Sequence, residues 1–179
     1  MTRIGIVRHG STAWNKEGRA QGSADIPLDE NGRAEAGKLA ERLSTENWDF
    51  IYSSNLLRAK QTAEIIGGKI GGLQVRLDSR LREAGGGQIE GTTEEERIEK
   101  WGKGWRDLNL GLESADSVIA RGLPCIEEIA KQHENKNILI VSHGSFIRSL
   151  LLELIDNAST KWDLKNTSLT TIAKTKSGW

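Results

Sequence analysis

Two stretches far apart in the chain end in the same chemical groups, and each contains a histidine. Residues Ile4–Ser11 read IGIVRHGS and residues Ile138–Ser145 read ILIVSHGS, so both follow the skeleton I-x-I-V-x-H-G-S. Each is typical of a buried strand that runs into a tight turn. Ligands of open α/β sheets bind beyond the carboxyl ends of parallel strands. We therefore expect His9 and His143 to face one site if the two strands are neighbours; alone, each would be an ordinary turn histidine.

Two arginines are candidates for binding an anion beside these histidines. Arg8 directly precedes His9, and Arg58 lies about three positions into a helix for which Asn55 is the expected N-cap. Helix N-termini favour phosphate, and the planar arginine fork offers donors to its oxygens. The alternative for each arginine alone is a pair with a nearby carboxylate. Together, the two arginines and two histidines predict a phosphate pocket.

A neutral imidazole in such a pocket indicates nucleophilic catalysis through a phosphohistidine. Neighbouring guanidinium groups would help to keep the ring unprotonated. The departing alkoxide then needs an acid, and Glu83, which lies between Leu81 and a run of glycines, is the best placed carboxyl in the sequence. The alternative for Glu83 is a surface ion pair with Arg80 or Arg82.

Other phosphate chemistries fit the sequence poorly. It contains neither a P-loop motif nor a G-x-G-x-x-G fingerprint. Cys125 is followed six residues later by Lys131, not by arginine, so we interpret it as a core residue and not as a phosphatase nucleophile. The histidines and carboxylates do not have the spacing of a two-metal site.

The composition narrows the partners and the compartment. Lysine and arginine together number 25, and so do aspartate and glutamate together. The net charge therefore gives no reason to expect nucleic acid or a membrane as a partner. A single cysteine rules out an internal disulfide. Because the sequence shows neither a signal-peptide pattern nor a membrane-spanning apolar run, we expect a cytoplasmic protein.

Strand patterns alternate with helix patterns along the chain. Helical patterns of apolar residues precede or follow the later strands. These strands are expected at Phe50–Ser53, Gln74–Leu77, Asn137–Ser142 and Thr167–Ala173. This alternation predicts one domain over residues 1–179, a three-layer α/β/α sandwich with a mostly parallel central sheet.

Residues 84–113 are expected to form a cap or insertion over the site. Thr93 and Glu96 have the spacing of a capping box, and the following helix would place Ile98, Trp101, Trp105 and Leu108 on one face. Glycines at 102 and 104 weaken that helix, which favours a mobile cover. The next helix would begin at Ser114 or Asp116, with a kink or break at Pro124.

Five segments in their order resemble the motifs of the histidine phosphatase superfamily, also called the phosphoglycerate mutase family. They are RHGSTAWN at 8–15, SSNLLRAKQTA at 53–63, LREAGGGQIEG at 81–91, VSHGS at 141–145 and NTSLT at 166–170. The resemblance implies a phosphoglycerate mutase-like fold without a metal or a dissociable cofactor. It also implies that His9 is the phosphorylated nucleophile and Glu83 the proton donor. The residues implied to hold the phosphoryl oxygens are Arg8, Arg58 and His143, and those implied to line the pocket are Asn15, Gln21, Gly22 and Gly144.

Within this family the sequence favours a phosphatase. Cofactor-dependent mutases typically follow the catalytic glutamate with an arginine and a Tyr-Gly pair, whereas Glu83 is followed by Ala84, Gly85 and Gly86. The family's Gly-Glu-Ser is also interrupted here, as GLES at 111–114. The alternatives are a mutase and a non-catalytic phosphate-binding regulatory protein. We expect a small phosphorylated metabolite as the substrate, with a phosphoprotein as the weaker alternative; oligomeric state stays open. The candidates for binding a second anionic group are Lys16, Arg19, Lys100, Lys103 and Arg106.

Overall fold

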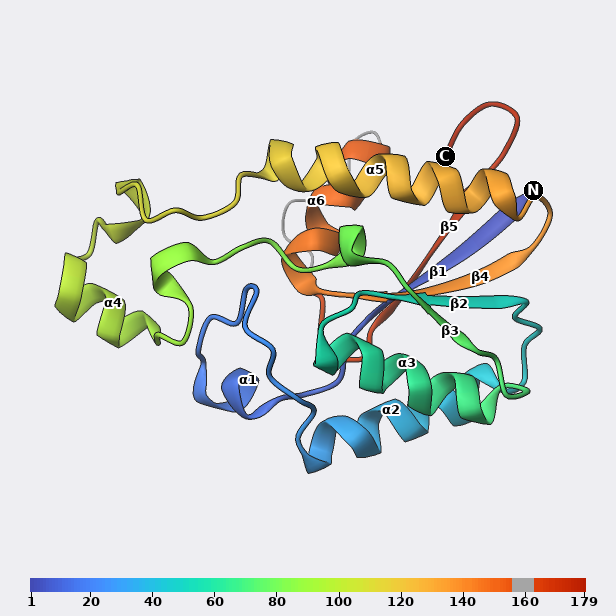
Figure 1. The fold of residues 1–179 in the computed structure, drawn as a ribbon, viewed down its shortest axis with the longest axis horizontal. Coiled ribbons are helices and arrows are strands. Elements are labelled where there is room, and N and C mark those ends of the chain that lie inside the picture. Colours follow the sequence, from blue (N-terminus) through green and yellow to red (C-terminus); the bar gives the residue numbers. More distant parts are fainter. Residues whose placement is uncertain (156–162) are drawn as a thin grey trace.

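A computed structural model describes residues 1–155 and 163–179, and its centre is a five-stranded sheet in the order β3-β2-β4-β1-β5. The strands are β1 (Thr2–Arg8), β2 (Phe50–Ser53), β3 (Val75–Leu77), β4 (Asn137–Ser142) and β5 (Leu169–Lys174). The helices are α1 (Ala13–Glu17), α2 (Glu30–Leu43), α3 (Leu57–Lys69), α4 (Glu94–Trp101), α5 (Ala115–Gln132) and α6 (Gly144–Leu154). Figure 1 shows α2 and α3 on one face of the sheet and α5 and α6 on the other. The predicted three-layer α/β/α architecture is confirmed.

The sheet is parallel except at one edge. β4 pairs in parallel with both β1 and β2, and β2 pairs in parallel with β3. β5 runs antiparallel to β1. The last strand begins at Leu169, later than predicted, because Thr167 takes a left-handed conformation with φ of 57°.

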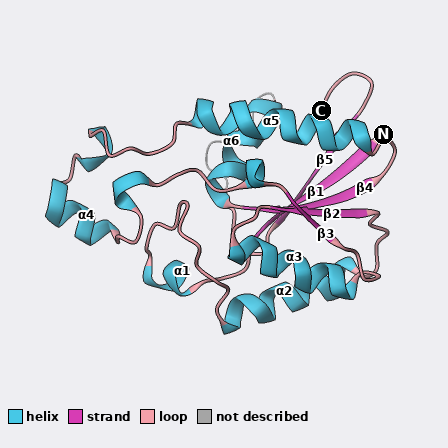
Figure 2. Ribbon diagram, in the orientation of Figure 1, coloured by secondary structure: helices cyan, strands magenta, loops and turns pink. Residues whose placement is uncertain are grey.

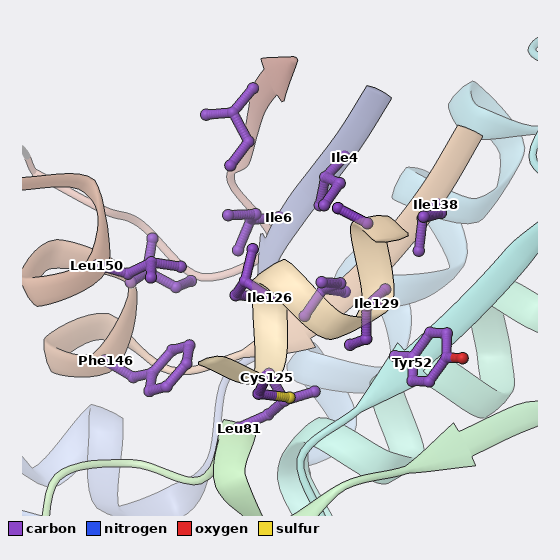
Figure 3. Close-up of a cluster of buried hydrophobic side chains, with 14 of the residues drawn as sticks. Ile4, Ile6, Tyr52, Leu81, Cys125, Ile126, Ile129, Ile138, Phe146 and Leu150 are labelled. Atoms are coloured by element: carbon purple, nitrogen blue, oxygen red, sulfur yellow. The ribbon is translucent and has the colours of Figure 1, made fainter. Parts of the chain in front are cut away.

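Both faces of the central strands are buried. Ile138 and Ile140 of β4 pack in the core under α5 and α6, part of which is drawn in Figure 3, while Leu139 and Val141 pack against α2 and α3. Such two-sided burial is the reason for the continuous apolar runs in the sequence. Cys125 is fully buried in the first of these cores, which confirms its interpretation as a core residue, and burial raises the pKa of its thiol to about 12.

The start of α3 differs from the prediction. The N-cap position is Leu56, which gives no side-chain cap, and Asn55 is exposed. Asp25 from the preceding loop supplies the missing acceptor, with its Oδ1 2.7 Å from the backbone nitrogen of Leu57. Arg58 is therefore the second residue of the helix, and the cap comes from a residue distant in sequence.

The helix α5 begins as expected but does not break. Ser114 is its N-cap, with its hydroxyl accepting from the backbone of Ser117. The helix then continues through Pro124 to Gln132, so a break at Pro124 is wrong, and the alternative, a kink there, stays a prediction. No helix of the described residues is long and apolar enough to cross a membrane.

Residues 84–113 extend beyond the carboxyl edge of the sheet as loops with short helices (Figure 2). The predicted capping box of Thr93 and Glu96 is present at the start of α4. The predicted apolar face is wrong, because α4 ends at Gly102 with φ of 83° and Leu108 is exposed. Trp105 lies in a separate 3₁₀ turn and is buried in a small core of its own.

Candidate active site

The two histidines of the repeated skeleton lie side by side. Arg8 and Ser142 are register partners at the ends of the neighbouring strands β1 and β4, so the next residue of each strand emerges at the same edge of the sheet. The rings of His9 and His143 have centroids 5.2 Å apart. The adjacency that the sequence argument required is thus present.

His9 has one ring nitrogen fixed and one available. Its Nδ1 lies 2.7 Å from the carbonyl oxygen of Gly10, which can only accept, so Nδ1 carries the hydrogen and Nε2 carries the lone pair. Burial lowers the pKa of His9 well below its usual range, and the positive charge of Arg58 lowers it further. The ring is consequently neutral at physiological pH, the state that a nucleophile requires.

The turn that carries His9 is held by close backbone contacts. Gly10 donates its N–H to Thr62 Oγ1 of α3 at 3.0 Å, and Asn166 Nδ2 donates to the carbonyl of His9 at 2.9 Å. A Cβ on Gly10 would lie 2.6 Å from the carbonyl oxygen of Gly32, so only glycine allows α2 to approach the turn this closely.

His143 lies deeper than His9 and is fully buried. Its Nε2 lies 2.8 Å from Ser54 Oγ, and this hydroxyl already accepts the N–H of Leu56. The serine hydrogen can then go to Nε2, which leaves the ring hydrogen on Nδ1. Burial, followed by the charge of Arg58, lowers the pKa of His143 well below its usual range.

Both predicted arginines lie beside these rings. Arg58 is 1% exposed and donates to the carbonyls of Ala24 at 2.6 Å and Gly22 at 2.8 Å. Burial lowers its pKa to about 10, which still leaves it charged at neutral pH. Arg8 donates to the carbonyl of Leu164, and burial also lowers its pKa.

The site contains buried donors that have no partner among residues 1–155 and 163–179. In the part of the chain that the structure describes, four buried side-chain nitrogens lack a partner, and three of them are Arg8 Nε, Arg58 Nε and His143 Nδ1. The fourth, Trp48 Nε1, lies in the core between the sheet and α2 and α3. Buried donors are nearly always hydrogen-bonded. Three unpaired donors around His9 are what an anion would satisfy.

Glu83 lines the same cavity as His9 and the two arginines. Its Oε1 accepts from the backbone of Ala84 at 2.8 Å and of Phe146 at 2.9 Å, and its Oε2 accepts from Ser145 at 3.1 Å. The amino end of α6 therefore holds this carboxyl. The alternative surface pairs did not form, since Arg80 pairs with Asp78 and Glu128 and Arg82 donates to the carbonyl of Ser79.

A cavity of about 420 Å³ joins these groups, and its wall includes Arg8, His9, Arg58 and Glu83. Three of the predicted pocket residues, Asn15, Gln21 and Gly22, also line it. The hydroxyl of Thr12 donates its single hydrogen to Gln21 Oε1 at 2.8 Å, and the backbone N–H of Thr12 donates to Asn15 Oδ1 at 3.2 Å, so both amides are held. Gly22 has φ of 50°, and a Cβ there would collide with Glu90. His143 and Gly144 are not among the lining residues, although a Cβ on Gly144 would be 3.4 Å from Arg8 Nε.

Several wall residues were not among the predicted site residues. Ser145 and Ser149 lie one turn apart on α6, a spacing that was visible in the sequence once His143 was chosen. The other unpredicted residues of the wall are Ala20, Ala84, Gly85, Gly86, Ile89, Leu112, Glu113, Ala115 and Val118. Among the five basic candidates for a second anion, Arg19 lines the cavity, but it is already paired with Glu17 and Glu96.

The fold and the site define an α/β protein with a cavity at the carboxyl edge of its sheet, lined by His9, Arg8 and Arg58. A family model described as "Histidine phosphatase superfamily (branch 1)" matches residues 4–179. The chain belongs to the histidine phosphatase superfamily.

Relatives in this superfamily have both mutase-like and phosphatase names. The chain is 36% identical over 176 residues to phosphoglycerate mutase-like protein 4 of Arabidopsis thaliana, covering 93% of this chain and 76% of that one. It is 34% identical over 189 residues to a metal-independent phosphoserine phosphatase of the same plant, covering 100% and 79%. A solved mycobacterial glucosyl-3-phosphoglycerate phosphatase in complex with VO3 superposes with a TM-score of 0.86 at 32% identity, covering 96% and 92%.

Proposed function

We propose that the protein is a metal-independent phosphomonoester hydrolase that works through a phosphohistidine on His9. The observation that carries the proposal is the set of unpaired buried donors on Arg8, Arg58 and His143 around a neutral ring whose Nε2 carries a lone pair. A phosphoryl group is an anion that would satisfy these donors and present phosphorus to Nε2. Phosphatases among the relatives support the same reaction class.

The reaction has two steps. First, His9 Nε2 attacks phosphorus, the ester P–O bond breaks, and Glu83 protonates the leaving alkoxide. Second, Glu83 takes a proton from water, the water oxygen attacks phosphorus, and the P–N bond breaks to release phosphate. Oε1 of Glu83 accepts two backbone N–H groups and Oε2 accepts one, so a lone pair on Oε2 is left for the proton. Arg8, Arg58 and His143 would stabilise the charge on the phosphoryl oxygens in both steps.

The substrate is proposed to be a small phosphorylated metabolite. The cavity wall includes apolar residues, among them Ala84, Leu112 and Val118, and the basic residue Arg19 in the wall is already paired with Glu17 and Glu96. An exposed apolar surface at Trp101 and Trp105 would favour a phosphoprotein. Trp105 is buried and Trp101 is half-buried, so a phosphoprotein stays the weaker alternative. Residues 84–113 are proposed as a cover of the cavity. Arg19 holds this segment, because its guanidinium group donates to the carboxyl of Glu96 and to the carbonyl of Gly91. A cytoplasmic location stays a prediction from the sequence.

A phosphoglycerate mutase is the second candidate, because mutase-like proteins are among the relatives. One preparation tests both functions in the presence of a chelator. We expect phosphate release from an aryl phosphate, and no interconversion of phosphoglycerates when the bisphosphate primer is added. Dominant interconversion would establish a mutase. Absence of both activities, together with tight phosphate binding, would favour the non-catalytic regulatory protein.

A further inference from the structure

An ion pair lies directly behind the proposed proton donor. Arg121 of α5 and Glu113, which precedes that helix, make two parallel contacts, Nε to Oε1 at 2.9 Å and Nη2 to Oε2 at 3.0 Å. Their side chains are only 12% and 15% exposed. Paired bonds of this kind fix geometry as well as charge.

Arg121 uses its remaining donors on the loop that carries Glu83. Its Nη1 donates to the carbonyls of Arg80 at 2.7 Å and Arg82 at 2.9 Å, and its Nη2 donates to the carbonyl of Glu83 at 3.0 Å. One guanidinium group therefore holds three carbonyls of this short segment.

Glu113 holds the same loop on the other side of Glu83. Its Oε2 accepts from the backbone nitrogen of Gly85 at 3.0 Å, and its own backbone nitrogen donates to the carbonyl of Gly85 at 2.8 Å. Ser117 donates to Oε1 at 2.9 Å. The hydrogen bonds of Arg121 lower the pKa of Glu113 to about 2, so its carboxyl is charged throughout the neutral range.

The pair thus fixes the backbone before and after Glu83, while the amino end of α6 fixes its carboxyl. Glu113 borders the cavity, but Arg121 is not part of the wall and reaches the site only through the loop. We propose that Arg121, paired with Glu113, is a positioning residue that sets where the Glu83 carboxyl stands relative to the leaving oxygen. This inference rests on the proposed function, and it gives the glutamate of the interrupted GLES motif a role.

A series of phosphate esters with leaving groups of different pKa tests the inference in Arg121→Met, Arg121→Lys and Glu113→Gln. Alkyl phosphates need protonation of the leaving oxygen, whereas 4-nitrophenyl phosphate does not. Misplacement of Glu83 should lower kcat/KM for alkyl phosphates by about 10- to 100-fold and for 4-nitrophenyl phosphate by less than about threefold. A merely structural role would lower both by the same factor.

Combination with Glu83→Gln provides the second test. If Arg121 acts through Glu83, Arg121→Met should lower kcat/KM for alkyl phosphates almost no further once Glu83 is replaced. Arg3→Met, which breaks the pair of Arg3 with Glu46 at the amino end of β1, is the matched control and should leave the leaving-group dependence unchanged.

The outcomes separate cleanly. Equal losses for all leaving groups, full additivity with Glu83→Gln, or no loss at all would overturn the inference. Should Arg121→Met fail to fold, Glu113→Gln, which keeps the size of the side chain, decides by the same criteria. A wild-type protein without any turnover would instead overturn the proposed function.

Discussion

The ends of β1 and β4 have the same local sequence but place their histidines differently. His9 and His143 follow matching apolar runs and emerge at the same edge of the sheet. His9 lines the cavity with its Nε2 available, whereas His143 is fully buried with its Nε2 on Ser54. The two residues therefore differ in which ring nitrogen the protein occupies.

The difference comes from the chain that follows each histidine. After His9 the chain turns at Gly10 and packs against Gly32 of α2. After His143 the next residue, Gly144, begins α6, whose first N–H groups hold Glu83. One strand end thus presents the proposed nucleophile, and the other supports the proposed acid. The shared motif places both histidines at the same edge of the sheet, and the chain that follows each histidine determines which role that residue takes.

Replacing His9 should have the largest effect. His9→Ala should lower turnover by about 10⁴-fold or more, because it removes the attacking atom. The measurement is phosphate release, with thermal unfolding to establish that the fold is intact. His133→Ala is the matched control, since this histidine follows α5 and contacts Tyr52, outside the cavity wall. Substantial activity in His9→Ala would remove His9 from the nucleophile role.

Replacing Glu83 should affect only substrates that need an acid. Glu83→Gln should slow hydrolysis of alkyl phosphates by about 10²- to 10⁴-fold and of activated aryl phosphates far less. Parallel assays of a glycerol-type phosphate and 4-nitrophenyl phosphate measure the ratio, and Glu46→Gln, in the distant pair with Arg3, is the control. Equal losses on both substrates would exclude Glu83 as the acid.

Replacing His143 should reduce turnover without preventing phosphorylation of His9. His143→Ala removes the buried donor at Nδ1. Because removal of one donor that stabilises transition-state charge typically lowers kcat by about 10²- to 10³-fold, we expect a loss of that size. Ser54→Ala keeps the ring and removes only its orienting partner, so it should cost less. If His143→Ala lost the phosphoenzyme as completely as His9→Ala, the distinction between the two strand ends would be wrong.

Buried neutral histidines should make stability fall in mild acid. The folded-state pKa of His143 is lowered, so below an unfolded pKa near 6.5 the unfolded chain binds a proton that the folded chain does not. Between pH 7 and pH 5 the unfolding free energy should therefore fall, by at most about 2 kcal/mol for this one histidine. Denaturant unfolding at both pH values measures it, and in His143→Ala the dependence should shrink by that amount. An unchanged dependence would mean that the ring is protonated in the folded state.

The sequence predicted the site best where strand ends determine position. His9 and His143 depend only on two apolar runs that pair in register, and Arg58 depends on a helix whose buried stripe was clear. The predictions that were wrong concern features that depend on tertiary contacts. Asp25 and not Asn55 supplies the cap of α3, and Gly102 ends α4 before Trp105 can join its face.

The two residues that hold the loop of Glu83 could not be predicted from local sequence patterns. Arg121 lies on a helix face among apolar positions, and its three carbonyl partners belong to a loop about 40 residues earlier. Glu113 was visible only as part of an irregular motif. Side chains that act through backbone carbonyls leave no periodic signal, because any residue type can supply the carbonyl.

A direct test of the central claim is detection of the phosphoenzyme. The protein would be mixed with a labelled phosphate ester, quenched rapidly in alkali and digested for mass spectrometry. The account predicts an alkali-stable, acid-labile phosphoryl group on His9, absent in His9→Ala and present in His143→Ala. A phosphoryl group on another residue, or turnover without any covalent phosphoenzyme, would contradict it.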